Sequence, residues 1–116
     1  MKDAIKEVLQ DENYTIADDI IVFDAVSDKV DYWKNENYNF EIEDYLLEFL
    51  ENRYGITLEV GAGIGRCTEP LSTISEHIVA LEPSLHALKY LKKRNIKNIS
   101  YVANNDFKLP FKNNSF

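Results

Sequence analysis

From residue 55 onward, the chain alternates between two patterns of apolar residues, one typical of strands and one typical of helices. Short apolar runs rich in isoleucine and valine predict buried strands. Stretches in which apolar residues recur every three or four positions predict helices. The predicted strands are Ile56–Val60, His77–Leu81 and Asn98–Ala103, and the predicted helices between them are Arg66–Ser75 and Ser84–Arg94. This β-α-β-α-β series, with right-handed crossovers, predicts an α/β fold whose parallel strands lie in the order 3-2-1.

The region before residue 55 has helical periodicity instead. Its apolar residues predict amphipathic helices at Met1–Gln10, Ile16–Val26 and Glu41–Arg53, with a loop and a short helix at Lys29–Phe40. We therefore expect two regions: a helical lid or cap at residues 1–54 and a βαβαβ half-domain at residues 55–116.

Two residues mark the ends of the last predicted helix. Ser84 precedes it and is a favourable N-cap, because its hydroxyl can accept a free backbone N–H of the first turn. Asn95 follows it and can take the left-handed conformation that ends many helices.

Three glycines at alternate positions follow the first predicted strand, namely Gly61, Gly63 and Gly65. Glycine permits positive φ angles and lets a ligand approach the backbone closely. The free N–H groups at the start of the next helix offer donors to such a ligand. A dinucleotide fingerprint, G-x-G-x-x-G, requires its third glycine where this chain has Arg66. The loop therefore predicts a nucleotide cofactor but departs from the pattern of NAD-binding proteins.

An acidic residue ends the second predicted strand. Glu82 lies 21 residues after Gly61, and an acid about 20 residues beyond a glycine loop is where a βαβ unit places a carboxylate against ribose hydroxyls. A carboxylate is suited to this contact because it accepts from both hydroxyls.

A third motif follows the last predicted strand and reads Asn104-Asn105-Asp106-Phe107-Lys108-Leu109-Pro110-Phe111, then Lys-Asn-Asn-Ser-Phe. With Glu59-x-Gly61-x-Gly63-x-Gly65 and Glu82, it resembles the class I S-adenosylmethionine-dependent methyltransferases, which carry G-D-x-x-x-L-P-F-x-x-x-S-F-D here. The resemblance covers Leu58 to Phe116. It implies a Rossmann-like three-layer α/β/α sandwich, half of the family's seven-stranded sheet, and S-adenosyl-L-methionine as cofactor.

The resemblance also implies the cofactor contacts. Glu59 would reach the methionine end of the cofactor, directly or through water; the alternative is that it pairs with Arg66 or a lysine. The family's acidic residue for the adenine amino group falls on Asn105, and Asp106 is next to it. The expected cofactor-binding residues are Glu59, Gly61, Ala62, Gly63, Gly65, Glu82, Pro83, Asn105 and Asp106.

The methyl acceptor and the catalytic residues stay unassigned. In the resembling family they come from the fourth strand onward and from the lid, so we expect the 116-residue chain to be a cofactor-binding half that is inactive alone. The Leu-Pro-Phe and Ser-Phe elements are typical of enzymes that act on small molecules. The sequence Gly-Ala-Gly-Ile-Gly-Arg also occurs in relatives that methylate protein N-termini or phosphoethanolamine.

Two other functions compete with this reading. A non-catalytic half-domain would self-associate, because its first strand would be an exposed apolar sheet edge that favours a homodimer. A nicotinamide-dependent dehydrogenase is disfavoured by Arg66 and by the Leu-Pro-Phe segment.

Composition narrows the partners and the compartment. A net charge of −7 without a dense run of lysine and arginine disfavours nucleic acid. The single cysteine, the lack of an apolar run near 18 residues and the lack of a signal peptide predict a cytoplasmic protein without a membrane span. His77 and His86 lack the spacing of metal ligands, and we expect no metal site. We expect Cys67 to be a small buried residue, while Tyr32, Trp33 and Tyr38 either line the lid or cap the core.

Overall fold

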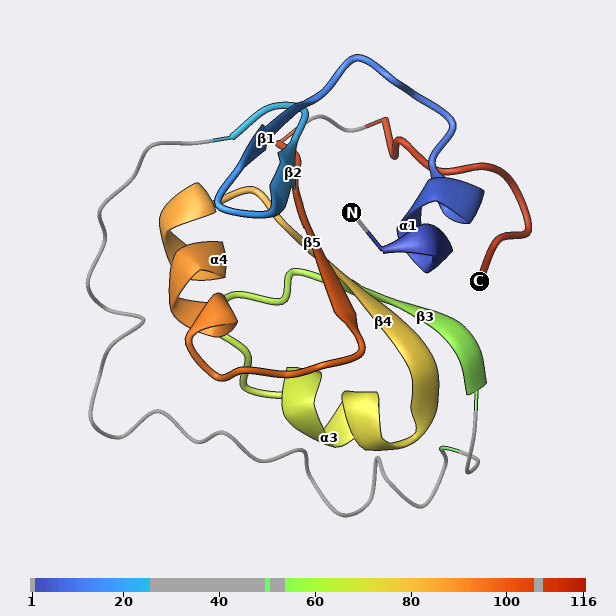
Figure 1. Cartoon of the computed structure of the whole chain (residues 1–116), viewed down its shortest axis with the longest axis vertical. Helices are drawn as coiled ribbons and strands as arrows, with labels where there is room; N and C mark the ends of the chain where they lie inside the picture. The colour runs from blue at the N-terminus through green and yellow to red at the C-terminus, as the bar shows by residue number, and fades with distance from the viewer. Residues whose placement is uncertain (1, 26–49, 51–53, 106–107) are drawn as a thin grey trace.

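The computed structural model describes residues 2–25, 50, 54–105 and 108–116. The described elements, shown in Figure 1, are α1 (Asp3–Val8), β1 (Thr15–Ala17), β2 (Ile20–Val22), β3 (Tyr54–Val60), α3 (Thr68–Thr73), β4 (Ser75–Glu82), α4 (Leu85–Lys92) and β5 (Ile99–Ala103). The predicted helix at Glu41–Arg53, apart from Leu50, and the aromatic residues Tyr32, Trp33 and Tyr38 lie outside the described residues.

The described strands form one sheet in the order β1-β2-β5-β4-β3. β3, β4 and β5 are parallel neighbours, so the predicted order 3-2-1 is confirmed. Their register places Glu59 beside Ala80 and Leu81 beside Val102, which brings the carboxyl ends of the strands to one edge of the sheet. The order extends beyond the prediction, because β2 adds in parallel to β5 and β1 pairs antiparallel to β2.

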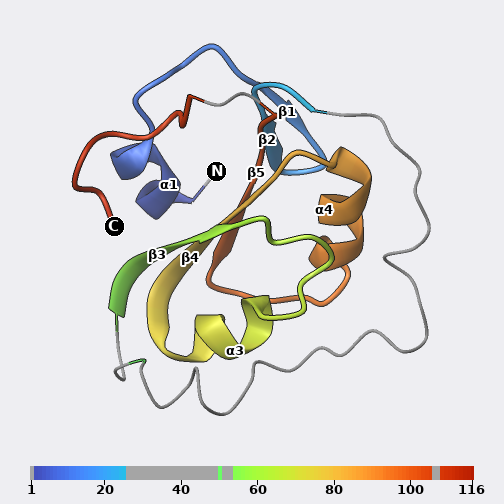
Figure 2. The ribbon, with the colours of Figure 1, turned by 180° about the vertical axis from the view of Figure 1, so that it is seen from behind.

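Helices cover both faces of the sheet, as the two opposite views show (Figures 1 and 2). On one face, apolar residues of α4 pack against Ile78, Ala80 and Tyr101. On the other, Ile5 and Val8 of α1 pack against alternate residues of the same strands. Because successive residues of a strand point to opposite faces, the buried strands are apolar on both sides. This arrangement confirms the Rossmann-like three-layer α/β/α fold.

The predicted helix at Ile16–Val26 is wrong, because residues 15–22 form the β1–β2 hairpin. Asp18 and Asp19 have φ angles of 52° and 63°. Two consecutive positive φ angles make a tight hairpin turn and are incompatible with a right-handed helix. Ile20 and Ile21, which are adjacent in sequence, are buried on opposite faces of the sheet. An apolar run covered on both faces is typical of a strand, so the helical spacing here is coincidental.

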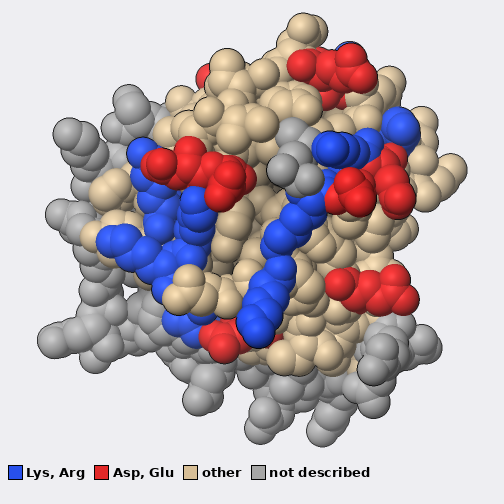
Figure 3. All heavy atoms as spheres, viewed as in Figure 1, with Lys and Arg blue, Asp and Glu red and all other residues tan. Residues whose placement is uncertain are grey.

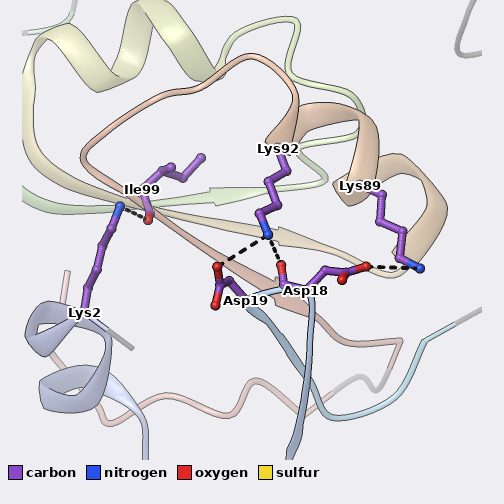
Figure 4. Close-up of polar contacts among 6 residues, drawn as sticks. All are labelled: Lys2, Asp18, Asp19, Lys89, Lys92 and Ile99. Carbon is purple, nitrogen blue, oxygen red and sulfur yellow. Dashed lines mark hydrogen bonds and ion pairs between the residues drawn. The ribbon is translucent and has the colours of Figure 1, made fainter.

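Charged side chains hold the hairpin against the end of α4 (Figure 4). The Lys89 ammonium lies 3.7 Å from the Asp18 carboxylate, and the Lys92 ammonium lies 3.5 Å from the Asp19 carboxylate and donates to the Asp18 carbonyl. Lys2, which precedes α1, makes a separate contact with β5. Its ammonium donates to the Ile99 carbonyl at 2.7 Å, and burial lowers the pKa of Lys2. The ion pairs are largely exposed, so each contributes no more than about 1 kcal/mol. They position a hairpin whose stability comes from its buried isoleucines.

The carboxyl-terminal segment packs against α1. The Gln10 N–H donates to the Pro110 carbonyl at 2.8 Å, and the Lys112 N–H donates to the Val8 carbonyl at 2.8 Å. Phe111 is buried in the same core as α1. The Leu-Pro-Phe segment therefore has a packing role in this chain.

The hairpin predicts different effects at two isoleucines that a helix would place on one face. Ile20 is fully buried, whereas Ile16 is 56% exposed. We expect Ile20→Ala to lower the free energy of unfolding by about 2–5 kcal/mol, since it leaves a cavity, and Ile16→Ala to change it by no more than about 0.5 kcal/mol. Urea unfolding of both variants measures this. Similar losses at both positions would contradict the hairpin, because residues four apart share a helical face.

Candidate cofactor site

The glycine loop turns back over the neighbouring strand at the carboxyl end of β3. The Gly61 and Ala62 N–H groups both donate to the Leu81 carbonyl, at 2.8 and 3.1 Å. Gly61, Gly63 and Gly65 all have positive φ angles, of 74°, 58° and 101°. Residues with a Cβ rarely adopt such angles, so this path of the backbone accounts for the alternate glycines.

Two of these glycines have different surroundings. A Cβ on Gly65 would lie 2.4 Å from Cδ1 of Leu91, so Gly65 allows the loop to pack directly on α4. A Cβ on Gly61 would meet nothing within 4 Å, so the backbone faces open space there. Gly65 therefore serves packing, and Gly61 leaves room for a ligand beside the strand ends.

Glu82 joins this loop to the start of α4. Its side chain is buried, with 6% of its surface exposed. Oε1 accepts from the Gly63 N–H at 3.1 Å, and Oε2 accepts from the Ser84 N–H at 2.7 Å. Ser84 also caps α4 as predicted, because its hydroxyl accepts from the Ala87 N–H at 3.1 Å. The side chain of Glu82, which the sequence predicts to bind the ribose, thus lies directly against the glycine loop.

Glu59 has a different environment on the adjacent strand. Its Oε1 accepts a 2.5 Å hydrogen bond from the hydroxyl of Thr68. Burial raises the pKa of Glu59, and the hydrogen bond from Thr68 lowers it in part. The partner that the structure gives Glu59 is therefore a hydroxyl, and the nearby acid Glu69 pairs with Arg94. The sequence does not single out Thr68, whose only signal is a hydroxyl residue at the start of the helix after the loop.

The structure describes one of the two residues predicted to contact adenine. Asn105 is exposed, and Asp106 lies outside the described residues. Pro83 is partly buried between Glu82 and Ser84. Asn104, which is not among the predicted contacts, is buried. Its N–H donates to the Glu82 carbonyl at 3.4 Å, and its side-chain amide donates to the Lys108 carbonyl at 3.2 Å. Asn104 thus positions the segment after β5 beside the end of β4.

The comparisons with known proteins identify the domain. The sequence profile of the methyltransferase domain family matches residues 58–116. This chain belongs to the methyltransferase domain family. The family indicates S-adenosylmethionine as the cofactor. The match begins within β3 and includes the glycine loop, Glu82 and the Leu-Pro-Phe segment.

A search of solved structures finds phosphoethanolamine N-methyltransferase 1 of Haemonchus contortus, in complex with phosphoethanolamine and S-adenosylhomocysteine, at 25% sequence identity and a TM-score of 0.46. The alignment covers 51% of this chain and 13% of that chain. No curated protein matches the chain by sequence.

Two other candidate residues, Cys67 and His77, have partners of their own in the structure. Cys67 is half-buried, and a guanidinium nitrogen of Arg66 lies 3.5 Å from its sulfur. His77 is buried and shares a 2.8 Å hydrogen bond with the Ser100 hydroxyl; burial, and then the charge of Lys2, lower its pKa. No group of three or more potential metal ligands occurs among the described residues.

One face of the chain carries charged side chains of both signs. On the face shown in Figure 3, lysine and arginine side chains lie beside aspartate and glutamate side chains. A hollow of about 480 Å³ between the hairpin and the end of α4 includes Lys2, Asp19, Lys92 and Tyr101. It lies at the amino ends of β2 and β5. In the described part of the chain, no helix has the length and hydrophobicity to cross a bilayer.

The packing of the loop gives a prediction about stability. Gly65→Ala places a methyl group against Leu91 and imposes a positive φ on alanine, so we expect the free energy of unfolding to fall by at least about 2 kcal/mol. Gly55→Ala is the matched control, since its Cβ meets nothing within 4 Å, and should change stability by no more than about 0.5 kcal/mol. Equal urea midpoints for the two variants would contradict the close contact with α4.

Proposed function

We propose that this domain binds S-adenosylmethionine at the glycine loop and supports methyl transfer to a small-molecule acceptor. The observation that carries the proposal is the buried carboxylate of Glu82 at the carboxyl end of β4, in contact with the glycine loop at the carboxyl end of β3. Ligands of open α/β sheets bind at this edge, outside the carboxyl ends of the strands.

The residues have separate tasks in this proposal. Glu82 accepts from the ribose hydroxyls, because a carboxylate has about four acceptor positions and the two backbone donors occupy two of them. Gly61 and Gly63 let the cofactor approach the backbone, and Glu59 faces its amino-acid end. Asn105 or Asp106 contacts the adenine.

Methyl transfer from this cofactor depends mainly on the alignment of the acceptor atom with the methyl group. The sulfonium of S-adenosylmethionine already makes its methyl group electrophilic, so holding an acceptor atom in line with that methyl supplies much of the rate. We infer a small-molecule acceptor from the Leu-Pro-Phe and Ser-Phe elements at residues 109–111 and 115–116. We propose that the 116-residue chain binds cofactor without transferring the methyl group by itself.

Calorimetric titration with S-adenosylmethionine and S-adenosylhomocysteine tests the site. We expect micromolar binding of both and none of NAD. Glu82→Gln should weaken binding at least about tenfold, because the amide group cannot accept all the hydrogen bonds that the carboxylate accepts. Glu76→Gln is the control, since Glu76 lies on the same strand but is exposed.

Urea unfolding of Glu82→Gln must accompany the titration, because Glu82 also holds the loop. A folded wild-type chain that binds neither cofactor form, or a folded Glu82→Gln variant with undiminished affinity, would contradict the proposed site.

A second candidate function is self-association through β3. This strand is the last in the order of the described sheet, and Val60 is 68% exposed. An unpaired strand with apolar side chains favours pairing with a second copy. We expect sedimentation velocity to show a concentration-dependent dimer, which Val60→Lys should weaken. A wild-type monomer at all concentrations would contradict it.

A further inference from the structure

Thr68 is a buried polar residue whose hydroxyl has a single use in the site. The side chain is fully buried, and its hydroxyl donates to Oε1 of Glu59 at 2.5 Å. Among the described residues, Oε2 of Glu59 has no hydrogen-bond partner. One oxygen of Glu59 is thus fixed by the protein, and the other remains available.

The fold places these two residues together although they belong to different elements. Glu59 lies next to the end of β3, in register with Ala80, on the sheet face that α4 and Leu71 of α3 cover. Thr68 is the first residue of α3, and its N–H donates to the Gly65 carbonyl at 3.4 Å. The glycine loop therefore sets the position of the hydroxyl as well as that of the backbone.

Two of the ionisable groups near Glu59 in the sequence and the sheet are acids that have partners elsewhere. From the loop and α3 the ionisable groups are Arg66, Cys67 and Glu69, and from β4 the group is Glu82. Glu69 pairs with Arg94, and Glu82 binds Gly63 and Ser84. Burial raises the pKa of Glu59, and in the described structure the hydrogen bond from Thr68 is the contact that lowers it.

We propose that Thr68 is a positioning residue that holds Glu59 as an oriented carboxylate for the ammonium group at the amino-acid end of the cofactor. This inference rests on the proposed function. A hydroxyl that donates to one oxygen stabilises the ionised form and leaves the second oxygen to accept from the ammonium. A charge-assisted bond of this kind is about twice as strong as a neutral one.

The sign of the pH dependence follows from this arrangement. The ammonium group binds the ionised form of Glu59, so affinity falls when the pH drops through the pKa of Glu59 in the free protein. Removing the Thr68 hydroxyl removes the contact that lowers this pKa. The loss of affinity must then begin at a higher pH.

Two ligands separate the role of Thr68 from a general effect on the site. S-adenosylhomocysteine carries the ammonium and the carboxylate of an amino acid, whereas 5′-methylthioadenosine carries the same nucleoside without them. A group that acts through Glu59 on the ammonium must affect only the first ligand.

The experiment is calorimetric titration of both ligands from about pH 5 to about pH 7, where the amino group of the ligand remains protonated. The proteins are the wild-type chain, Thr68→Val and Thr68→Ser. In Thr68→Val we expect affinity for S-adenosylhomocysteine to fall about tenfold at neutral pH and its pH midpoint to rise. Affinity for 5′-methylthioadenosine should stay within about twofold, and Thr68→Ser, which keeps the hydroxyl, should restore both properties.

Each other outcome has a definite meaning. Equal losses for the two ligands, or an unchanged pH midpoint in Thr68→Val, would overturn the positioning role while leaving the proposed function intact. A wild-type chain that binds neither ligand would overturn the proposed function and this inference with it. If Thr68→Val does not fold, Thr68→Ala takes its place, because alanine removes the same hydroxyl and favours a helix.

Discussion

The proposed cofactor site depends on one buried carboxylate. Glu82 accepts from two backbone N–H groups, one in the glycine loop and one at the start of α4. A buried charge is tolerated only when hydrogen bonds replace its lost hydration, and here the replacement comes from backbone that must take one particular path. The same two hydrogen bonds therefore hold the loop in place and stabilise the buried carboxylate. A ligand that binds Glu82 meets a loop already in place.

The second acid in the site, Glu59, has a complementary character. Both oxygens of Glu82 have partners in the protein, whereas among the described residues Glu59 has one partner, the Thr68 hydroxyl, and a pKa that burial raises. Since Glu59 is paired with Ala80 two residues before Glu82 on the next strand, the two acids share a face of the sheet. Glu82 thus holds the glycine loop in place, whereas Glu59 has an oxygen that can accept a hydrogen bond from a cation.

The sequence predicted the parts of the fold in which local pattern and tertiary burial agree. The three parallel strands, the Ser84 cap and the left-handed Asn95, whose φ is 57°, all follow from residue type and spacing. The hairpin was missed because its turn, Asp18-Asp19, lacks the glycine of a typical signal and because Ile16 and Ile20 imitate helical spacing. Only a position beside β5 buries Ile20 and Ile21 on opposite faces. The contact of Thr68 with Glu59 could not be predicted, because a contact between a strand and the following helix leaves no periodic pattern of residues in the sequence.

The two edges of the described sheet differ in what pairs with them. The hairpin pairs with β5, so the polar backbone groups on that side of β5 are satisfied over the length of β2. The opposite side ends in β3, the strand that leads into Gly61 and carries Glu59. Any segment that paired with β3 in parallel would end beside the glycine loop, because parallel strands bring their carboxyl ends to the same edge. A segment that paired with β3 in this way would therefore place its carboxyl end next to the proposed cofactor site.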